Sequence, residues 1–515
     1  LMNLAPQEIS LDVLREKYCK GEESTVDDVR RRVARALAAV ENFPASWEPI
    51  FYDVQRRGVV MAGRINSAAG TDLSATLINC FVQPVGDSIS GPDVAGYPGI
   101  FIALREAAET MRRGGGVGYD FSRIRPKGAV VSSTQSEASG PVSYMRIFDS
   151  SCETVQSAGA RRGAQMGILR VDHPDVEEFI RAKYEARELS NFNLSLAVPD
   201  AFMQALEADE QFDLVHAVAP SNRLAQERNI ERRADGLYVY QRVRARELWD
   251  RVMRSTYDHG EPGVVFIDRI HEDNTLHYCE RIEATNPCAE EPLPPYGCCC
   301  LGSINLAALI TEPFTERAAF SYPEYRRLIP VAVRMLDNVL DATSWPLPEQ
   351  HREAMAKRRI GLGVLGLGDA LIMLGVRYDS EEGRRLAGQW VRILRDCAYT
   401  ASIELAAERR PFPRFEAEAY LASGFVKRLP ENIRGLIAAQ GIRNSHLLAI
   451  APTGTITLAF ADNASNGIEP AFAPSTHRRR RKLEGGTTQQ IALDHAYRVY
   501  QSLKGEAAGL PPAFI

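Results

Sequence analysis

The sequence predicts an α/β fold with largely parallel strands, because short apolar strands alternate with helices along much of the chain. Residues 194–198 and 264–268 are typical of short buried strands, and a helix over residues 247–257 lies between them. Residues 323–343 form a further amphipathic helix whose leucines and valines are spaced to face a core. Such alternation is typical of parallel sheets covered by helices. The length of 515 residues fits either several domains or one large α/β barrel with additions.

Composition and charge are those of a soluble globular protein. Hydrophobic residues make up 45% and charged residues 25% of the chain, which excludes disordered, collagen-like and membrane classes. The net charge of -5 gives no overall basic field that would attract nucleic acid. The longest apolar runs, such as residues 447–451, are far shorter than the roughly 18 to 20 residues that span a bilayer. The N-terminus lacks a signal pattern, so we expect a cytoplasmic location and no membrane partner.

The first 55 residues are expected to be helical. Thr25 and Asp28 are spaced as a capping box, and apolar residues follow them at helical intervals. The arginines between these apolar positions are best explained as a solvated helix face.

Two loops in the first half of the chain have the composition of ligand-binding segments. Residues 114–118 are rich in glycine, which lets the backbone approach either a ligand or another part of the chain, and the sequence leaves both alternatives open. In residues 157–165, Arg161 and Arg162 lie between glycines and suit a phosphate-bearing ligand, with a plain exposed turn as the alternative. This loop leads into a strand predicted over residues 166–171.

A second phosphate-binding candidate follows a predicted buried strand over residues 446–451. Thr453, Gly454 and Thr455 turn off the end of this strand. Free backbone N–H groups and two hydroxyls at such a turn are the groups that cradle a phosphate, and an ordinary turn is the alternative.

Two other motifs are assigned structural roles. Gly361-x-Gly363-x-x-Gly366 matches a dinucleotide-binding pattern, but no buried strand precedes it, so we expect these glycines inside a closely packed helix. The basic run at residues 478–482 has no aromatic residues interleaved to stack bases, which favours a solvated or partner-facing surface over nucleic-acid binding.

The cysteines are the most unusual feature of the sequence. There are nine, and Cys288, Cys298, Cys299 and Cys300 fall within thirteen residues of a loop rich in proline and glycine. The odd number and uneven spacing do not fit a secreted disulfide framework, so reduced thiols are expected. No C-x-x-C pair occurs, and three adjacent cysteines cannot easily surround one zinc ion, so no metal site is predicted. Cys80, on a strand predicted over residues 76–82, taken alone is a small core residue.

Together these segments resemble the ribonucleotide reductases, and among them the class II, adenosylcobalamin-dependent catalytic chains. The most specific motif is Asn286-Pro287-Cys288-x-Glu290, which leads into Pro-Leu-Pro-Pro-Tyr-Gly-x-Cys and then Leu-Gly-Ser-Ile-Asn-Leu. The resemblance spans nearly the whole chain. It implies a ten-stranded α/β barrel of two parallel five-stranded halves with a central finger loop, covering residues 56–515 after an N-terminal helical segment. Cys288 would lie at the tip of the finger loop.

The activity that the resemblance implies is the radical-based reduction of ribonucleotides to 2′-deoxyribonucleotides. Adenosylcobalamin would generate a thiyl radical on Cys288, which would abstract the 3′-hydrogen of the ribose. Glu290 would act as the general base on the 3′-hydroxyl, and Asn286 would orient the sugar.

The reducing equivalents would come from two further thiols. Cys80 and Cys299 are implied to supply the electrons and to end as a disulfide, which a thioredoxin-like partner would reduce again. Cys298 and Cys300 have no implied role.

The resemblance also implies two nucleotide sites. The residues implied to bind the ribonucleotide substrate are Asn79, Thr453, Gly454 and Thr455. The residues implied to bind a deoxynucleotide effector are Asp87, Arg161 and Arg162. A homodimer is expected.

Chains of this family continue beyond the position of Ile515 and carry a C-terminal cysteine pair, so we expect either a fragment or a remainder on another polypeptide. Two alternative functions stay open on the sequence. The chain could be a class I ribonucleotide reductase large subunit, or a catalytically inactive nucleotide-binding regulatory protein.

Overall fold

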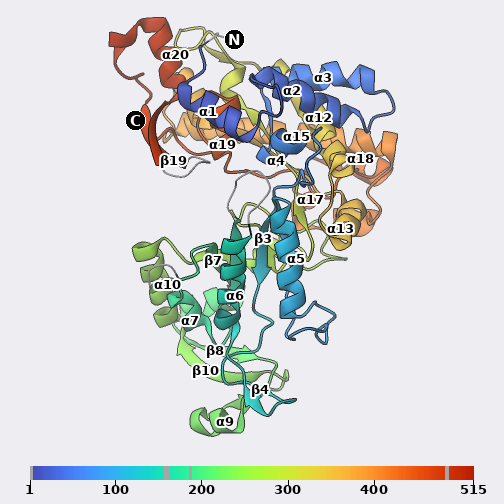
Figure 1. The fold of residues 1–515 in the computed structure, drawn as a ribbon, viewed down its shortest axis with the longest axis vertical. Helices are drawn as coiled ribbons and strands as arrows, with labels where there is room; N and C mark the ends of the chain where they lie inside the picture. Colours follow the sequence, from blue (N-terminus) through green and yellow to red (C-terminus); the bar gives the residue numbers. More distant parts are fainter. Residues whose placement is uncertain (1–3, 156–162, 185–187, 482–486, 515) are drawn as a thin grey trace.

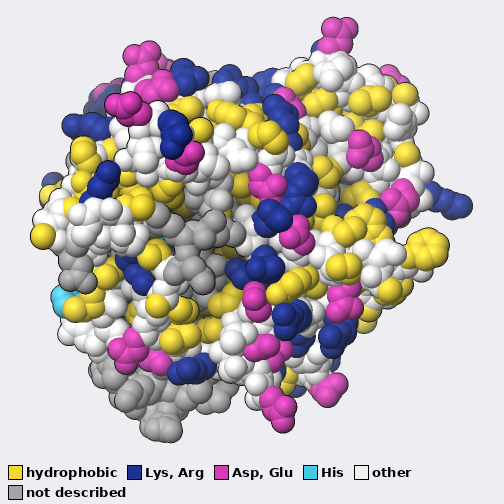
Figure 2. Space-filling model, turned by 90° about the horizontal axis from the view of Figure 1, so that it is seen from above, with side chains coloured by type: hydrophobic (Ala, Val, Ile, Leu, Met, Phe, Trp, Pro, Cys, Tyr) yellow, Lys and Arg dark blue, Asp and Glu magenta, His cyan; other side chains and the backbone are white. Residues whose placement is uncertain are grey.

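The computed structural model describes residues 4–155, 163–184, 188–481 and 487–514. In Figure 1 the strands and helices of residues 80–260 occupy the lower part of the molecule. The N-terminal helices and the C-terminal segments lie together in the upper part. Charges of both signs are interspersed over the face drawn in Figure 2.

The lower part is built on five parallel strands. Their order is β2 (Cys80–Val82), β3 (Gly116–Asp120), β6 (Gln165–Arg170), β7 (Phe192–Val198) and β11 (Gly263–Phe266). Helices α5 (Ile100–Arg112), α6 (Pro141–Thr154), α7 (Val176–Arg181) and α10 (Ala245–His259) share a hydrophobic cluster with this sheet. The predicted five-stranded parallel half is therefore confirmed.

The strand predicted over residues 76–82 is shorter than expected and begins at Cys80. Before it, the backbone N–H of Thr76 donates to the carbonyl of Arg113, and that of Leu77 donates to the Thr343 hydroxyl. These contacts replace the ladder that a longer strand would need.

The second half of the barrel is built around β15 (Leu301–Asn305). This strand pairs in parallel with β18 (Gly361–Leu365) and antiparallel with β1 (Val59–Met61). The segment predicted as a strand at residues 446–451 makes one parallel bridge to β18, between Leu448 and Leu362. Together with the first half, these strands form the α/β barrel.

The glycine pattern at residues 361–366 was wrongly expected inside a helix. Residues 361–365 form β18, and the helix α14 (Leu367–Met373) starts only after them. A side chain on Gly363 would collide with the backbone carbonyl of Ala449 on the neighbouring segment. Glycine is therefore needed here for close approach of two extended segments.

Two features join the halves of the barrel. β14 (Cys298–Cys299) pairs antiparallel with β2, and the chain then continues directly into β15. Just before β14, the finger loop runs between β12 (Ala284–Thr285) and β13 (Pro292–Leu293), which pair with each other. A side chain on Gly118 of β3 would collide with the backbone carbonyl of Thr285. Glycine at this position therefore allows the start of the finger loop to pack directly against β3.

The N-terminal residues are helical, as predicted. They form α1 (Glu8–Lys17), α2 (Val26–Ala38) and α3 (Pro44–Arg57), and Thr25 and Asp28 make the predicted capping box. These helices share one hydrophobic cluster with α12 (Tyr322–Ala342) and α15 (Glu381–Arg409). The division at residue 55 into a segment and a barrel stays a prediction.

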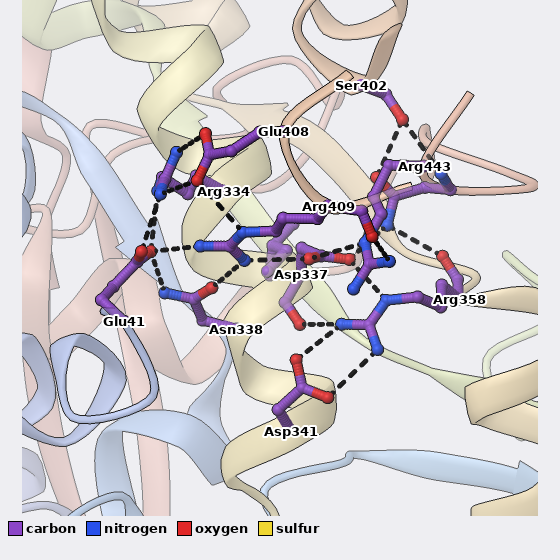
Figure 3. Close-up of polar contacts among 12 residues, drawn as sticks. Glu41, Arg334, Asp337, Asn338, Asp341, Arg358, Ser402, Glu408, Arg409 and Arg443 are labelled. Carbon is purple, nitrogen blue, oxygen red and sulfur yellow. Dashed lines mark hydrogen bonds and ion pairs between the residues drawn. The ribbon is translucent and has the colours of Figure 1, made fainter. Parts of the chain in front are cut away.

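A buried ion network reinforces this packing (Figure 3). Glu41, which follows α2, accepts hydrogen bonds of 2.7 Å from Arg334 and pairs with Arg409 at 2.6 Å. Asp337 on α12 pairs with Arg358 at 2.8 Å and with Arg443 at 3.3 Å. The network ties the N-terminal helices to the outer helices of the second half.

The C-terminal part carries α19 (Gly454–Phe460), the hairpin of β19 (Ser475–Arg481) and β20 (Thr487–Leu493), and α20 (His495–Lys504). Most of the basic run lies on β19. Across the described ranges, no helix is both long and apolar enough to cross a membrane. The other α-helices and β-strands are α4 (Gly63–Ala68), β4 (Val130–Val131), β5 (Ser136–Glu137), α8 (Asp200–Ala208), β8 (Gln211–His216), α9 (Asn222–Arg228), β9 (Glu231–Arg232), β10 (Tyr238–Arg244), α11 (Ile267–Asp273), β16 (Ile310–Thr311), β17 (Ala319–Phe320), α13 (Pro348–Lys357), α16 (Ala417–Leu421), α17 (Gly424–Lys427) and α18 (Glu431–Gln440).

Candidate active site

A cavity of about 150 Å³ opens where the finger loop meets both halves of the barrel. Seven of the residues predicted for the site line it: Asn79, Cys80, Cys288, Glu290, Thr453, Gly454 and Thr455. They come from positions up to several hundred residues apart in the sequence. The fold therefore brings the predicted thiol, carboxylate and phosphate-binding groups to one place.

The tip of the finger loop is held by Asn286. Its side-chain amide donates to the Glu290 carboxylate at 2.5 Å, and its side-chain oxygen accepts from the Glu291 N–H at 2.9 Å. Its backbone N–H also donates to the Glu291 carbonyl at 3.2 Å. Asn286 is fully buried, whereas Cys288 is exposed toward the cavity. The loop thus presents one thiol and one carboxylate on a tightly bonded turn.

A neighbouring barrel strand also supports this turn. The side chain of Asn193 on β7 donates to the carbonyl of Pro287 at 2.8 Å. Ala289 adopts a left-handed conformation with φ of 67°, and its N–H donates to the Asn286 carbonyl at 3.0 Å. These contacts fix the direction in which Cys288 points.

The structure places Cys299 directly opposite Cys80 in the antiparallel pair of β14 and β2. Side chains of directly opposite residues lie on the same face of a sheet, within reach of each other. Burial, together with the neighbouring Cys80 thiol, raises the pKa of the Cys299 thiol well above its usual range. Cys80 lines the cavity and Cys299 lies buried behind it.

The two flanking cysteines are placed differently. Cys298 lies opposite Phe81, and the Cys300 thiol donates to the carbonyl of Leu336 on α12 at 3.4 Å. All nine cysteines are free thiols in this structure.

The phosphate-binding candidate forms the first turn of α19. Thr453 has a left-handed backbone with φ of 50°, and its hydroxyl accepts a hydrogen bond from the Gly467 N–H at 3.0 Å. The helix begins at Gly454, and N–H groups of a first helical turn have no partner within the helix. This turn is far from the finger loop in the sequence, yet both line the same cavity.

The cavity also contains residues that the sequence did not single out. Among them are Lys17 at the end of α1, Arg64 and Ser67 on α4, and Ser303 on β15. Arg64 is buried, and a side chain on Gly114 would lie 2.7 Å from its guanidinium. The glycine-rich residues 114–118 therefore make room for other parts of the chain. The high density of glycines in the sequence indicates such a close approach, but it does not indicate which side chain fills the space.

The predicted effector residue Asp87 is not among the residues that line this cavity. Asp87 accepts hydrogen bonds from the backbone and guanidinium of Arg125, at 2.9 and 3.2 Å. Arg161 and Arg162 fall outside the described residues. The assignment of all three to an effector site stays a prediction.

Comparison with known proteins identifies the family to which this α/β barrel belongs. Residues 78–503 match the family described as ribonucleotide reductase, barrel domain. This match covers most of the chain, which therefore belongs to the ribonucleotide reductase family.

Its relatives include two proteins named vitamin B12-dependent ribonucleoside-diphosphate reductase. The one from Mycobacterium tuberculosis (strain CDC 1551 / Oshkosh) is 39% identical over 90% of this chain and 62% of its own length. The one from Thermoplasma acidophilum is 38% identical over 79% of this chain and 47% of its own. A ribonucleoside-diphosphate reductase subunit alpha from Chlamydia muridarum is 27% identical over 86% of this chain and 44% of its own. The chain thus spans about three fifths, or less, of the length of these relatives.

Proposed function

We propose that this chain carries out the radical-based reduction of ribonucleotides to 2′-deoxyribonucleotides. One observation supports this above all others. A single cavity combines an exposed thiol, Cys288, with a carboxylate, Glu290, and with Cys80, whose strand partner is Cys299. These are the groups that removal of a ribose 2′-hydroxyl requires.

In the proposed reaction the finger loop activates the sugar. Cys288, as a thiyl radical, removes the hydrogen from the 3′-carbon, and Glu290 accepts the proton of the 3′-hydroxyl. Asn286 holds Glu290 through the 2.5 Å hydrogen bond, so the carboxylate and the thiol keep a fixed relation to the sugar.

The thiol pair supplies the reduction. Loss of the 2′-hydroxyl as water, with hydrogen added at the 2′-carbon, consumes two protons and two electrons. Oxidation of Cys80 and Cys299 to a disulfide releases that number of each. A dithiol of thioredoxin-like type then reduces the disulfide, and it reaches Cys80 first because Cys80 lines the cavity.

The proposed substrate is a ribonucleoside diphosphate, as the names of the relatives in Mycobacterium and Thermoplasma suggest for those proteins. Asn79 and the first turn of α19, from Thr453 to Thr455, would bind it, with phosphates on the N–H groups of that turn. We further propose a deoxynucleotide effector bound near Asp87 and the loop of Arg161 and Arg162, a homodimeric assembly and a cytoplasmic location.

The proposed cofactor is adenosylcobalamin, which the relatives' names support in its general form as vitamin B12. Cys288 is exposed on the cavity lining, as are Lys17 and Pro452, so its thiol is accessible to a group bound outside the cavity. Lys17 and Pro452 would contact the cofactor at the rim. When bound, adenosylcobalamin would supply the radical that takes the hydrogen atom of the Cys288 thiol. The higher identity to the B12-dependent relatives than to the Chlamydia subunit alpha favours this over the class I alternative.

The test is a single-turnover assay on pre-reduced protein with adenosylcobalamin and each ribonucleoside diphosphate. Cys288→Ser should abolish deoxynucleotide formation, because a hydroxyl does not replace the thiol as a radical carrier. Cys397→Ser, which changes a partly buried cysteine on α15, is the matched control and should react at the wild-type rate. Deoxynucleotide formation by a folded Cys288→Ser protein would contradict the proposal.

A further inference from the structure

Glu291 is a buried carboxyl group to which the proposed reaction assigns no role. Its residue is only 6% exposed, and neither carboxyl oxygen has a well-formed hydrogen bond to a described residue. Leaving a buried carboxyl unpaired costs free energy, so its position calls for an explanation. The backbone on either side is fixed, since Glu291 exchanges two hydrogen bonds with Asn286.

The side chain of Glu291 does not line the cavity, and its carboxyl group lies beside the buried Cys299 thiol. A side chain on Gly361 would collide with its Oε1 atom, so the start of β18 leaves space for the carboxyl group. Gly361 also donates its N–H to the carbonyl of Cys300 and is paired with Leu301. The carboxyl therefore lies between β18 and the cysteines of β14.

One of the groups that shift the pKa of this carboxyl group is Cys299, a member of the proposed redox pair. Burial raises the pKa of Glu291 to about 8, the Cys299 thiol and the Arg359 guanidinium oppose this, and the Glu290 carboxylate adds to it. Glu291 in turn raises the pKa values of Cys298, Cys299 and Cys300, although burial is the largest cause for each thiol. At neutral pH a carboxyl in this setting is mostly protonated.

We propose that Glu291 is the proton donor to the Cys299 sulfur when the Cys80–Cys299 disulfide is reduced. The inference rests on the proposed function only in taking this disulfide as the product of turnover. A thiolate of the incoming dithiol attacks the Cys80 sulfur, the S–S bond breaks, and Cys299 leaves with the electron pair. Glu291 gives its proton to that sulfur, and the second thiol of the dithiol then releases Cys80 as the dithiol is oxidised to its own disulfide. The two protons lost by the dithiol restore the Glu291 carboxyl and the Cys80 thiol.

Cys299 needs such a donor because of where it lies. Its side chain is fully buried and does not line the cavity, so water cannot readily protonate its thiolate. An uncompensated thiolate in this core would be strongly disfavoured. Cys80, at the cavity wall, has no such need.

The test measures disulfide reduction without nucleotide or cofactor. The intact chain, carrying Cys298→Ser and Cys300→Ser to leave Cys299 as the thiol opposite Cys80, is oxidised with diamide and the bond is located by peptide mapping. Dithiothreitol is then added between pH 6 and pH 9.5, and rates are divided by its thiolate concentration. The variants are Glu291→Gln and, as a matched control, Glu353→Gln. Like Glu291, Glu353 interacts electrostatically with Arg359, but it is not among the groups that shift the pKa of Cys299.

We expect Glu291→Gln to slow reduction about 10²-fold at pH 7 and to remove the pH dependence. In the parent and in Glu353→Gln, the corrected rate should be constant at low pH and fall as Glu291 loses its proton around pH 8. A Glu291→Gln protein that is reduced at the parent rate with the parent pH profile would overturn this inference alone. Failure to form a Cys80–Cys299 disulfide would overturn the assignment of the redox pair, and this inference with it.

Discussion

At the residue scale, successive side chains of a short strand point to opposite faces, which places three adjacent cysteines in different environments. Pairing with β2 places Cys299 against Cys80, while Cys298 faces Phe81. Cys300 turns toward α12 and donates to a backbone carbonyl. Chemical type alone could not distinguish the three thiols, and the register of one strand pair does.

This register predicts the outcome of serine substitutions. Cys299→Ser should prevent the disulfide with Cys80 after a single turnover, because no other thiol lies opposite Cys80. Cys298→Ser and Cys300→Ser should each leave that disulfide intact. Mass-spectrometric mapping of the oxidised protein checks all three, and a Cys80–Cys298 or Cys80–Cys300 bond in the wild-type protein would show the register argument to be wrong.

At the scale of elements, a buried pair of carboxyl groups holds α20 against α14. Asp369 on α14 accepts a hydrogen bond from the Ala496 N–H at 3.2 Å, and Asp494 caps the start of α20. Burial and the neighbouring Asp494 raise the pKa of Asp369 well above its usual range. The folded protein therefore retains a proton here that the unfolded chain has lost, and its stability falls as pH rises above about 4, the pKa of a free aspartate.

Asp369→Asn should remove this pH-dependent cost, because an amide stays neutral and still offers an oxygen to Ala496. Relative to wild type, the variant should gain about 1 kcal/mol or more in free energy of unfolding between pH 5 and pH 8. Urea unfolding at both pH values measures the difference, with Asp258→Asn at an exposed position as control. Parallel pH dependences of wild type and variant would contradict the argument.

At the scale of the whole molecule, the ion network of Figure 3 connects the N-terminal helices with the second half of the barrel. Burial alone would raise the pKa of Glu41, but hydrogen bonds from Arg334, Asn338 and Arg409 lower it to about 2. The stabilisation by Glu41 is therefore fully present above about pH 4.3, which is the pKa of a glutamate in the unfolded chain. It is lost as the pH falls toward 2.

Glu41→Gln should destabilise the protein by about 3 to 5 kcal/mol at pH 7, because it removes the carboxylate that Arg334 and Arg409 share in the buried network. The difference from wild type should shrink as pH falls from about 4 toward 2. Denaturant unfolding across this range measures both effects. Glu48→Gln, which breaks an exposed pair with Arg35, should cost less than about 1 kcal/mol. Equal losses for the two variants would show that the buried network does not carry this stabilisation.

The sequence by itself determined the alternation of strands and helices, the capping box at Thr25, and the finger-loop motif around Cys288. These depend on local spacing and on residue types within a few positions of each other. They also sufficed to indicate the family and seven of the residues that line the cavity.

The family resemblance already implied that Cys299 pairs with Cys80, and the strand register places the two opposite each other. Only the tertiary structure decided that residues 361–365 form a strand, and that Lys17 and Arg64 join the cavity. It also showed that Glu291 is buried beside Cys299. Each of these depends on contacts between segments far apart in the chain, such as β14 with β2 or β18 with residue 448. Local patterns do not encode such contacts, because packing between distant segments overrides short-range preference.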